Sequence, residues 1–255
     1  MPRKSISLSC WMCAVAGAVL AWLMLSAETV SRADDAPEVE RYEIRSDHDP
    51  SGLGKFYMGR EIAQVMGFPG APWLERRNRE EEERTTLMVK SLRLKPGMHV
   101  ADIGAGTGRI SLMMADAVGE EGTVFAVDIQ QEMLDLIGEK LTRSGQQNVE
   151  LVKGTEKSPE LEDATVDLAL MVDVYHEFAF PYEMMLALSK SLKPGGKVVF
   201  VEFRREDPDV PIKMVHKMSE AQVRKEMSPP EFGLKWIETI GVLPWQHILV
   251  FEKRK

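Results

Sequence analysis

The sequence predicts an α/β protein built on a mostly parallel sheet with helices on both faces. Two observations carry this prediction. From residue 99 onward, short apolar runs alternate with amphipathic helical segments, and a glycine-rich turn joins the first such run to the first helix. The chain has 255 residues, which is enough for one α/β domain with appended segments.

Residues 1–33 have the pattern of a secretory signal peptide or of an uncleaved N-terminal anchor. Two basic residues precede an apolar run over residues 10–25, and a small-x-small cleavage site ends at Ala33. A buried core helix is the less favoured alternative. Both cysteines, Cys10 and Cys13, lie in this segment, so a cleaved chain would have no disulfide and no thiol. We therefore expect an exported protein, periplasmic or otherwise extracytoplasmic, that contacts a membrane only if this segment is retained.

Residues 34–72 are expected to form a linker and an N-terminal cap ahead of the main domain, residues 73–255. Residues 34–55 are polar and glycine-rich, whereas residues 56–66 show a helical pattern in which Ile62, Val65 and Met66 share a face. A longer helix is expected over residues 73–92. Its run of arginines and glutamates is interpreted as an exposed, salt-bridged face.

Strands and helices then alternate through the main domain. Five apolar runs predict the parallel strands, and a short turn through Gly241 and Pro244 makes the last two strands an antiparallel hairpin. Expected strands are residues 99–103, 123–127, 149–153, 166–172, 197–203, 234–240 and 247–252, with helices from residue 109, around residues 133–141, and over residues 181–192 and 220–227.

The stretch HVADIGAGTGR, residues 99–109, predicts a nucleotide-binding corner. A strand ends in three alternating glycines and continues directly into a helix, whose first N–H groups are free to bind a ligand. The spacing G-x-G-x-G differs from the G-x-G-x-x-G of dinucleotide sites, and Asp102 stands two residues before the first glycine. A carboxylate there repels a pyrophosphate but suits a cationic amine. S-adenosylmethionine (SAM), which has an ammonium and a sulfonium but no phosphate, is therefore favoured over NAD(P).

Four segments resemble the motifs of the class I SAM-dependent methyltransferases, most closely their small-molecule, quinone- and sterol-type branch. VADIGAGTGR resembles the first motif, FAVDIQQEML the second, DLALMVDVYHEF the fourth and LKPGGKVVFVEF the strand-five motif. The resemblance covers roughly residues 73–253. It implies a Rossmann-like, seven-stranded, mostly parallel sheet with an antiparallel last strand, SAM as cofactor, and methyl transfer to a small-molecule acceptor.

The resemblance also implies where the cofactor binds. Asp128, at the tip of the second strand, is expected to accept hydrogen bonds from the ribose hydroxyls, and Asp102 to orient the methionine amine directly or through water. The glycine loop contributes Gly104, Ala105, Gly106, Thr107 and Gly108; Ile129 and Gln130 flank the adenine, Thr155 and Glu156 contact its amino group, and Val172 and Asp173 face the methionine part.

Three of the five histidines are expected at the ligand-binding edge of the sheet. His176 follows the fourth strand, His216 follows the fifth, and His247 opens the last strand, which runs the other way; Glu177 and Glu202 are expected at the same edge. We expect His176, Glu177, His216 and His247 to be the catalytic residues, with His176 taking a proton from the acceptor or orienting it. An ordinary structural role is the alternative. Their spacing matches no metal signature, so no metal site is expected.

Two further alternatives stay open at this stage. Tyr57, Met58 and Arg60 stand where related enzymes place a mobile cap, or they simply pack on the sheet. An exported SAM-binding protein without turnover competes with the enzyme, because SAM is made in the cytoplasm. A formal net charge of −8 does not favour binding to nucleic acid or to an anionic membrane, so a small molecule is the expected partner. The sequence leaves the oligomeric state open.

Overall fold

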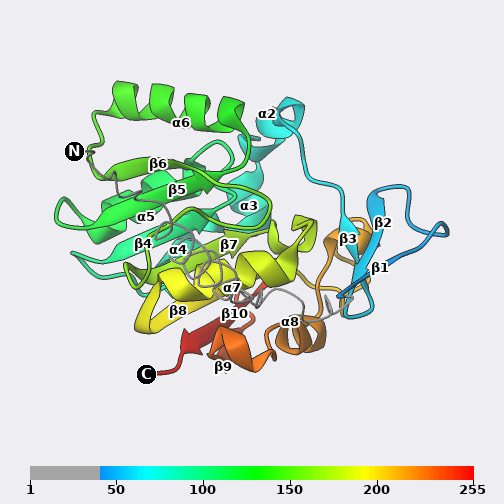
Figure 1. Ribbon diagram of the computed structural model, residues 1–255. Coiled ribbons are helices and arrows are strands. Elements are labelled where there is room, and N and C mark those ends of the chain that lie inside the picture. The colour runs from blue at the N-terminus through cyan, green and yellow to red at the C-terminus, as the bar shows by residue number, and fades with distance from the viewer. Residues whose placement is uncertain (1–40) are drawn as a thin grey trace, which may run out of the picture. The chain divides into compact units, whose positions relative to one another are not determined.

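A seven-stranded sheet forms the centre of residues 41–255, the part of the chain that the computed structural model describes (Figure 1). The expected signal peptide or anchor lies outside the described residues. Strand order is β6-β5-β4-β7-β8-β10-β9, parallel from β6 to β8, with β10 antiparallel to both neighbours. The predicted fold class is thereby confirmed. The strands are β4 (His99–Ile103), β5 (Thr123–Asp128), β6 (Val149–Lys153), β7 (Val166–Val172), β8 (Leu192–Phe203), β9 (Leu234–Ile240) and β10 (Gln246–Lys253).

Helices cover both faces of this sheet, as the alternating pattern predicted. Alternate residues of the central strands enter different cores: Val100 packs in one and Ala101 in the other. The first core includes α4 (Thr85–Ser91), α5 (Arg109–Val118) and α6 (Gln131–Ser144), and the second includes α7 (Pro181–Ser191) and α8 (Glu220–Glu226). Among residues 41–255, no helix combines the length and the apolar character needed to cross a bilayer.

A small antiparallel sheet precedes the main one, and here the sequence-based expectation of an arm followed by a helix is wrong. β1 (Tyr42–Ile44), β2 (Gly52–Tyr57) and β3 (Arg60–Ala63) pair in that order. Met58 and Gly59, with φ of 48° and 90°, form a two-residue turn between β2 and β3. Positive φ at both positions matches the twist of a tight hairpin, which the helical pattern of Ile62, Val65 and Met66 concealed.

The single helix expected over residues 73–92 is also wrong, because the chain forms three short helices there. These are α2 (Ala71–Leu74), α3 (Arg79–Glu83) and α4, and Arg84 separates the last two with a φ of 50°. The charge run is not a purely exposed face either. Arg79 and Glu83 are buried, with Nε and Oε2 2.8 Å apart, so each neutralises the charge that burial would otherwise leave unpaired.

Candidate active site

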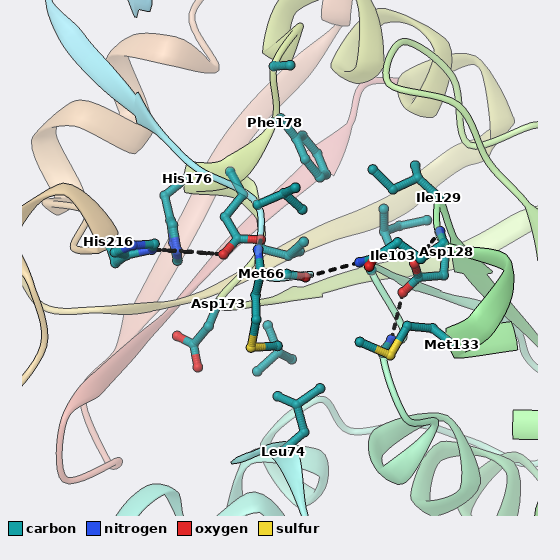
Figure 2. A pocket seen from close by; sticks show the side chains of 18 of the residues that line it. Met66, Leu74, Ile103, Asp128, Ile129, Met133, Asp173, His176, Phe178 and His216 are labelled. Atoms are coloured by element: carbon teal, nitrogen blue, oxygen red, sulfur yellow. Dashed lines mark hydrogen bonds and ion pairs between the residues drawn. The ribbon is translucent and has the colours of Figure 1, made fainter. Parts of the chain in front are cut away.

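A cavity of about 520 Å³ opens at the carboxyl ends of β4, β5, β6 and β7 (Figure 2). Ligands of open α/β sheets bind at this edge, and small-molecule sites have volumes of roughly 300–1,000 Å³. The cavity joins the two groups of residues that the sequence predicted separately. Its wall includes Gly104, Gly106, Asp128, Ile129, Gln130, Thr155, Glu156, Val172 and Asp173 of the expected cofactor site, and His176, Glu177 and His216 of the expected acceptor site.

The glycine loop lies tightly against its neighbours. Gly104 has a φ of +73°, and a Cβ there would lie 2.5 Å from Cγ2 of Val174. A Cβ on Gly106 would lie 2.8 Å from Cδ1 of Leu74. The backbone N–H groups of Gly104 and Ala105 both donate to the Val127 carbonyl, at 2.8 and 2.9 Å. A side chain at Gly104 or Gly106 would therefore collide with Val174 or Leu74, which glycine avoids.

Asp128 has the geometry expected of a group that accepts ribose hydroxyls. Its two carboxylate oxygens accept one backbone bond each, from Gly106 at 2.9 Å and from Gln130 at 2.8 Å. A carboxylate has about four lone-pair sites, so each oxygen retains a further acceptor site on the cavity wall. Burial raises the pKa of Asp128, and the backbone donors oppose that shift.

Asp173 provides the test of whether the cavity fits SAM. Its Oδ2 accepts from Gln246 Nε2 at 2.9 Å, whereas its Oδ1 is buried without a hydrogen-bond partner among the described residues. Burial raises the pKa of Asp173 well above its ordinary value. An ammonium ion would supply both the missing donor and the missing positive charge. The residues present therefore fit the methionine end of SAM here and the ribose at Asp128.

The structure places five of the predicted residues away from the cavity wall. Asp102 instead accepts a 2.6 Å hydrogen bond from Ser111 of α5, and burial raises its pKa to about 6. Direct contact between this carboxylate and a ligand in the cavity is therefore not supported. The other four are Ala105, Thr107, Gly108 and His247.

A cluster of polar side chains stands at the other end of the cavity. The sequence placed His176 and His216 on one edge, and the structure brings them together: Nε2 of His176 lies 3.2 Å from Nδ1 of His216, with the rings perpendicular. On its other side, Nδ1 of His176 lies 2.6 Å from Oε2 of buried Glu202. His247 is opposite Glu202 in the strand register, yet its ring does not reach the cavity.

Burial sets the protonation of this cluster. It lowers the pKa of His176 and that of His216 to about 4, so both imidazoles are uncharged at neutral pH. It raises the pKa of Glu177 to about 7 and that of Glu202 to about 8. An uncharged imidazole has a free lone pair on one ring nitrogen, which is the form that accepts a proton or binds a metal.

A segment that carries no sequence motif, residues 64–68, crosses the middle of the cavity. Figure 2 shows Met66 between the histidines on one side and Asp128 and Ile129 on the other. The Met66 N–H donates to Glu177 Oε2 at 3.2 Å, and its carbonyl accepts from Gln130 Nε2 at 3.0 Å. Gln130 Oε1 also accepts from the Phe68 N–H, so its amide is already bonded to this segment. No motif marked residues 64–68, because backbone groups make these contacts.

The residues considered as a mobile cap lie elsewhere. Tyr57 and Arg60 are buried, and neither they nor Met58 line the cavity, which agrees with the alternative of ordinary packing.

Comparison with known proteins agrees with the class that this fold and cavity define, a SAM-dependent methyltransferase domain. A family described as "Methyltransferase domain" matches residues 94–246, more than half of the chain. The chain therefore belongs to this methyltransferase domain family, whose cofactor is SAM.

Relatives and solved structures support the same assignment. A demethylmenaquinone methyltransferase of Shouchella clausii is 27% identical over 124 residues, which are 49% of this chain and 52% of that protein. An uncharacterized methyltransferase-like protein of Schizosaccharomyces pombe is 32% identical over 140 residues, 54% of this chain and 50% of that protein. The chain thus spans about half the length of these curated relatives. The crystal structure of a SAM-dependent methyltransferase from Aquifex aeolicus aligns with a TM-score of 0.69 and 26% identity, covering 74% of this chain and all of that one.

The ribose assignment gives a direct prediction. Asp128→Ala should weaken SAM binding about ten- to a hundredfold, since hydrogen bonds to a charged acceptor contribute about 1.5–3 kcal/mol. Titration calorimetry with SAM measures the effect, and Asp116→Ala on the exposed side of α5 is the matched control. An unchanged dissociation constant for Asp128→Ala would remove this residue from the cofactor site.

Proposed function

We propose that this protein transfers the methyl group of SAM to a small-molecule acceptor held at His176, Glu177 and His216. One observation carries the proposal: a single cavity is lined by the cofactor residues at one end and by this polar cluster at the other. Two ligands in one cavity can bring their reacting atoms to within about 3 Å, and such positioning supplies much of the rate of a two-substrate reaction.

The reaction divides into roles for named groups. SAM, when bound, supplies an electrophilic methyl group whose bond to sulfur breaks as the acceptor's lone pair bonds to carbon, leaving the electron pair on sulfur. Asp128 and Asp173 hold the two ends of the cofactor. His176, 2.6 Å from Glu202, is placed to orient the acceptor or to take the proton that it loses.

The cavity favours an apolar acceptor. Three apolar side chains on its wall outside the predicted cofactor residues, Leu53, Val65 and Trp73, are between 42% and 49% exposed, so an apolar ligand can reach them. Several relatives are named demethylmenaquinone methyltransferases, and their name indicates a quinone acceptor. Both facts support an acceptor with an apolar body and one polar reacting atom.

Methyl transfer to fractionated extracts tests this function. The protein is incubated with SAM carrying a labelled methyl group and with either the organic or the aqueous extract of the source cells. Label should appear in a product of the organic fraction. A protein that binds SAM by calorimetry but labels neither fraction would favour the alternative hypothesis, an exported binding protein without turnover.

We also propose export, on the basis of the basic start, apolar run and cleavage-site pattern of residues 1–33. The full chain expressed in a bacterial host should be found outside the cytoplasm, either cleaved near Ala33 or attached to the membrane. Cell fractionation, with a variant lacking residues 2–33 as control, measures this. Equal cytoplasmic retention of both chains would contradict the proposal.

A further inference from the structure

Three metal-ligating side chains converge at the acceptor end of the cavity. One ligand atom from each of His176, Glu177 and His216 lies within 4.8 Å of the other two. We propose that these three residues bind a divalent transition-metal ion, with Zn²⁺ as the reference ion, and that the ion's open positions bind an oxygen atom of the acceptor. The second part rests on the proposed function, with His176 orienting the acceptor through the ion and not taking its proton, whereas the first part does not.

The distances fit an ion at the centre of the cluster. Nε2 of His176 and Nδ1 of His216 are 3.2 Å apart, and each is 3.9 Å from Oε1 of Glu177. The point equidistant from these three atoms lies about 2.1 Å from each, within the usual range of zinc–nitrogen and zinc–oxygen distances. A tetrahedral ion with ligands at that distance separates its ligand atoms by about 3.4 Å, so Oε1 of Glu177 would have to move about 0.5 Å toward the two histidines.

Neighbouring groups fix the ligands in the orientation that a metal requires. As a carboxylate, Glu202 accepts from Nδ1–H of His176 at 2.6 Å and leaves the Nε2 lone pair facing the cluster, and its other oxygen accepts from the Tyr175 N–H at 3.1 Å. Binding of the ion therefore displaces the proton that burial holds on Glu202. A histidine ligand of a metal is typically held by a carboxylate on its second nitrogen in this way. Glu177 is also fixed, because its Oε2 accepts the Met66 N–H while Oε1 stays available. Glu202 is thus a positioning residue for His176.

The ligand set indicates the kind of ion and its role. Two imidazoles with one carboxylate suit zinc or iron(II), whereas calcium and magnesium prefer oxygen ligands alone. Three protein ligands leave a tetrahedral or octahedral ion with open positions, and all three ligand residues line the cavity. An acceptor that bears a hydroxyl or carbonyl oxygen is the chemical class that would occupy such a position.

The sequence predicted no metal here because the spacing is irregular. His176 and Glu177 are adjacent in the turn Tyr175–Glu177 after β7, and His216 lies in the turn Met214–His216 after β8. Neither turn matches a metal signature by itself, and only the pairing of β7 with β8 brings the two turns together.

Metal titration of the chelator-treated protein tests the site. The full chain is prepared without a histidine tag and with Cys10 and Cys13 replaced by serine, so that no thiolate competes. Calorimetry with ZnCl₂ should give one tight site per chain, and Co²⁺ should give visible absorption bands of a nitrogen–oxygen site. Glu177→Gln and His216→Ala should each weaken Zn²⁺ binding at least a hundredfold, and Glu202→Gln about ten- to a hundredfold.

The control is His99→Gln, a partly buried histidine at the start of β4, which should bind Zn²⁺ like the parent chain. Retained SAM affinity in each variant shows that the cavity is intact. Equal Zn²⁺ binding by His99→Gln and His216→Ala, or no stoichiometric binding by the parent, would overturn the metal site. Full methyl transfer by metal-free protein would overturn only the ion's role in acceptor binding. A bound ion without methyl transfer would contradict the proposed function but leave the metal site standing.

Discussion

Glu226→Ala should lower the free energy of unfolding by about 3–5 kcal/mol, the largest stability effect that we expect from one substitution. The Glu226 carboxylate accepts from Arg60 Nε at 2.7 Å and Nη2 at 2.9 Å, and also from the Tyr175 hydroxyl at 2.8 Å. Arg60 and Glu226 are both buried, so removing the carboxylate leaves a guanidinium without its counterion in a poorly solvated position. Urea unfolding followed by circular dichroism measures the change.

The same helix provides the control. Glu220 and Arg224 form a pair of the same chemistry on the exposed face of α8, with a nitrogen–oxygen distance of 3.1 Å. Glu220→Ala should change the free energy of unfolding by less than about 0.5 kcal/mol, as expected of exposed pairs one helical turn apart. Similar losses for Glu220→Ala and Glu226→Ala would show that burial does not determine the strength of the Arg60 pair.

His176→Ala should lower turnover by a hundredfold or more and leave SAM affinity nearly unchanged. The residue lies at the end of the cavity opposite Asp128, and loss of a group that handles the acceptor's proton typically costs about 10²–10⁴ in rate. His176→Ala also removes the partner of buried Glu202, so some loss of stability accompanies the loss of rate. Turnover, SAM titration and urea unfolding are measured on the same preparation.

His216→Ala separates the chemical from the structural effect. The His216 side chain is 24% exposed and is not bonded to Glu202, so its removal should change the free energy of unfolding little. Turnover should nevertheless fall by a comparable factor, because His216 lines the same end of the cavity. Normal turnover in His216→Ala together with early unfolding in His176→Ala would place the histidines among the structural residues.

The seven-stranded sheet was predictable from sequence because its signals are local. Each strand is a short apolar run followed by a helix, and the glycine loop identifies the strand that starts the cofactor site. Asp102 shows the limit of such signals. Neighbouring residues of a strand face opposite sides, so Ile103 reaches the cavity while Asp102 points to Ser111 of α5.

Errors at the sequence level arose where contacts are distant or where backbone conformation is unusual. Met58 and Arg84 adopt positive φ, which sequence patterns assign to glycine, so a hairpin and a helix break were missed. Arg79 is buried because it pairs with Glu83, which is also buried. A run of charged residues in the sequence does not indicate such burial. Topology placed the histidines on one edge, but strand register and side-chain reach decided that His216 meets His176 and His247 does not.

The contacts of Met66 have a consequence for how the two substrates bind. One peptide segment is tied through Gln130 to the cofactor end and through Glu177 to the acceptor end. A ligand that displaced this segment at one end would weaken its hydrogen bonds at the other end as well. Binding at the two ends would then be coupled through the backbone of one residue, and thermodynamic linkage would make the influence equal in both directions.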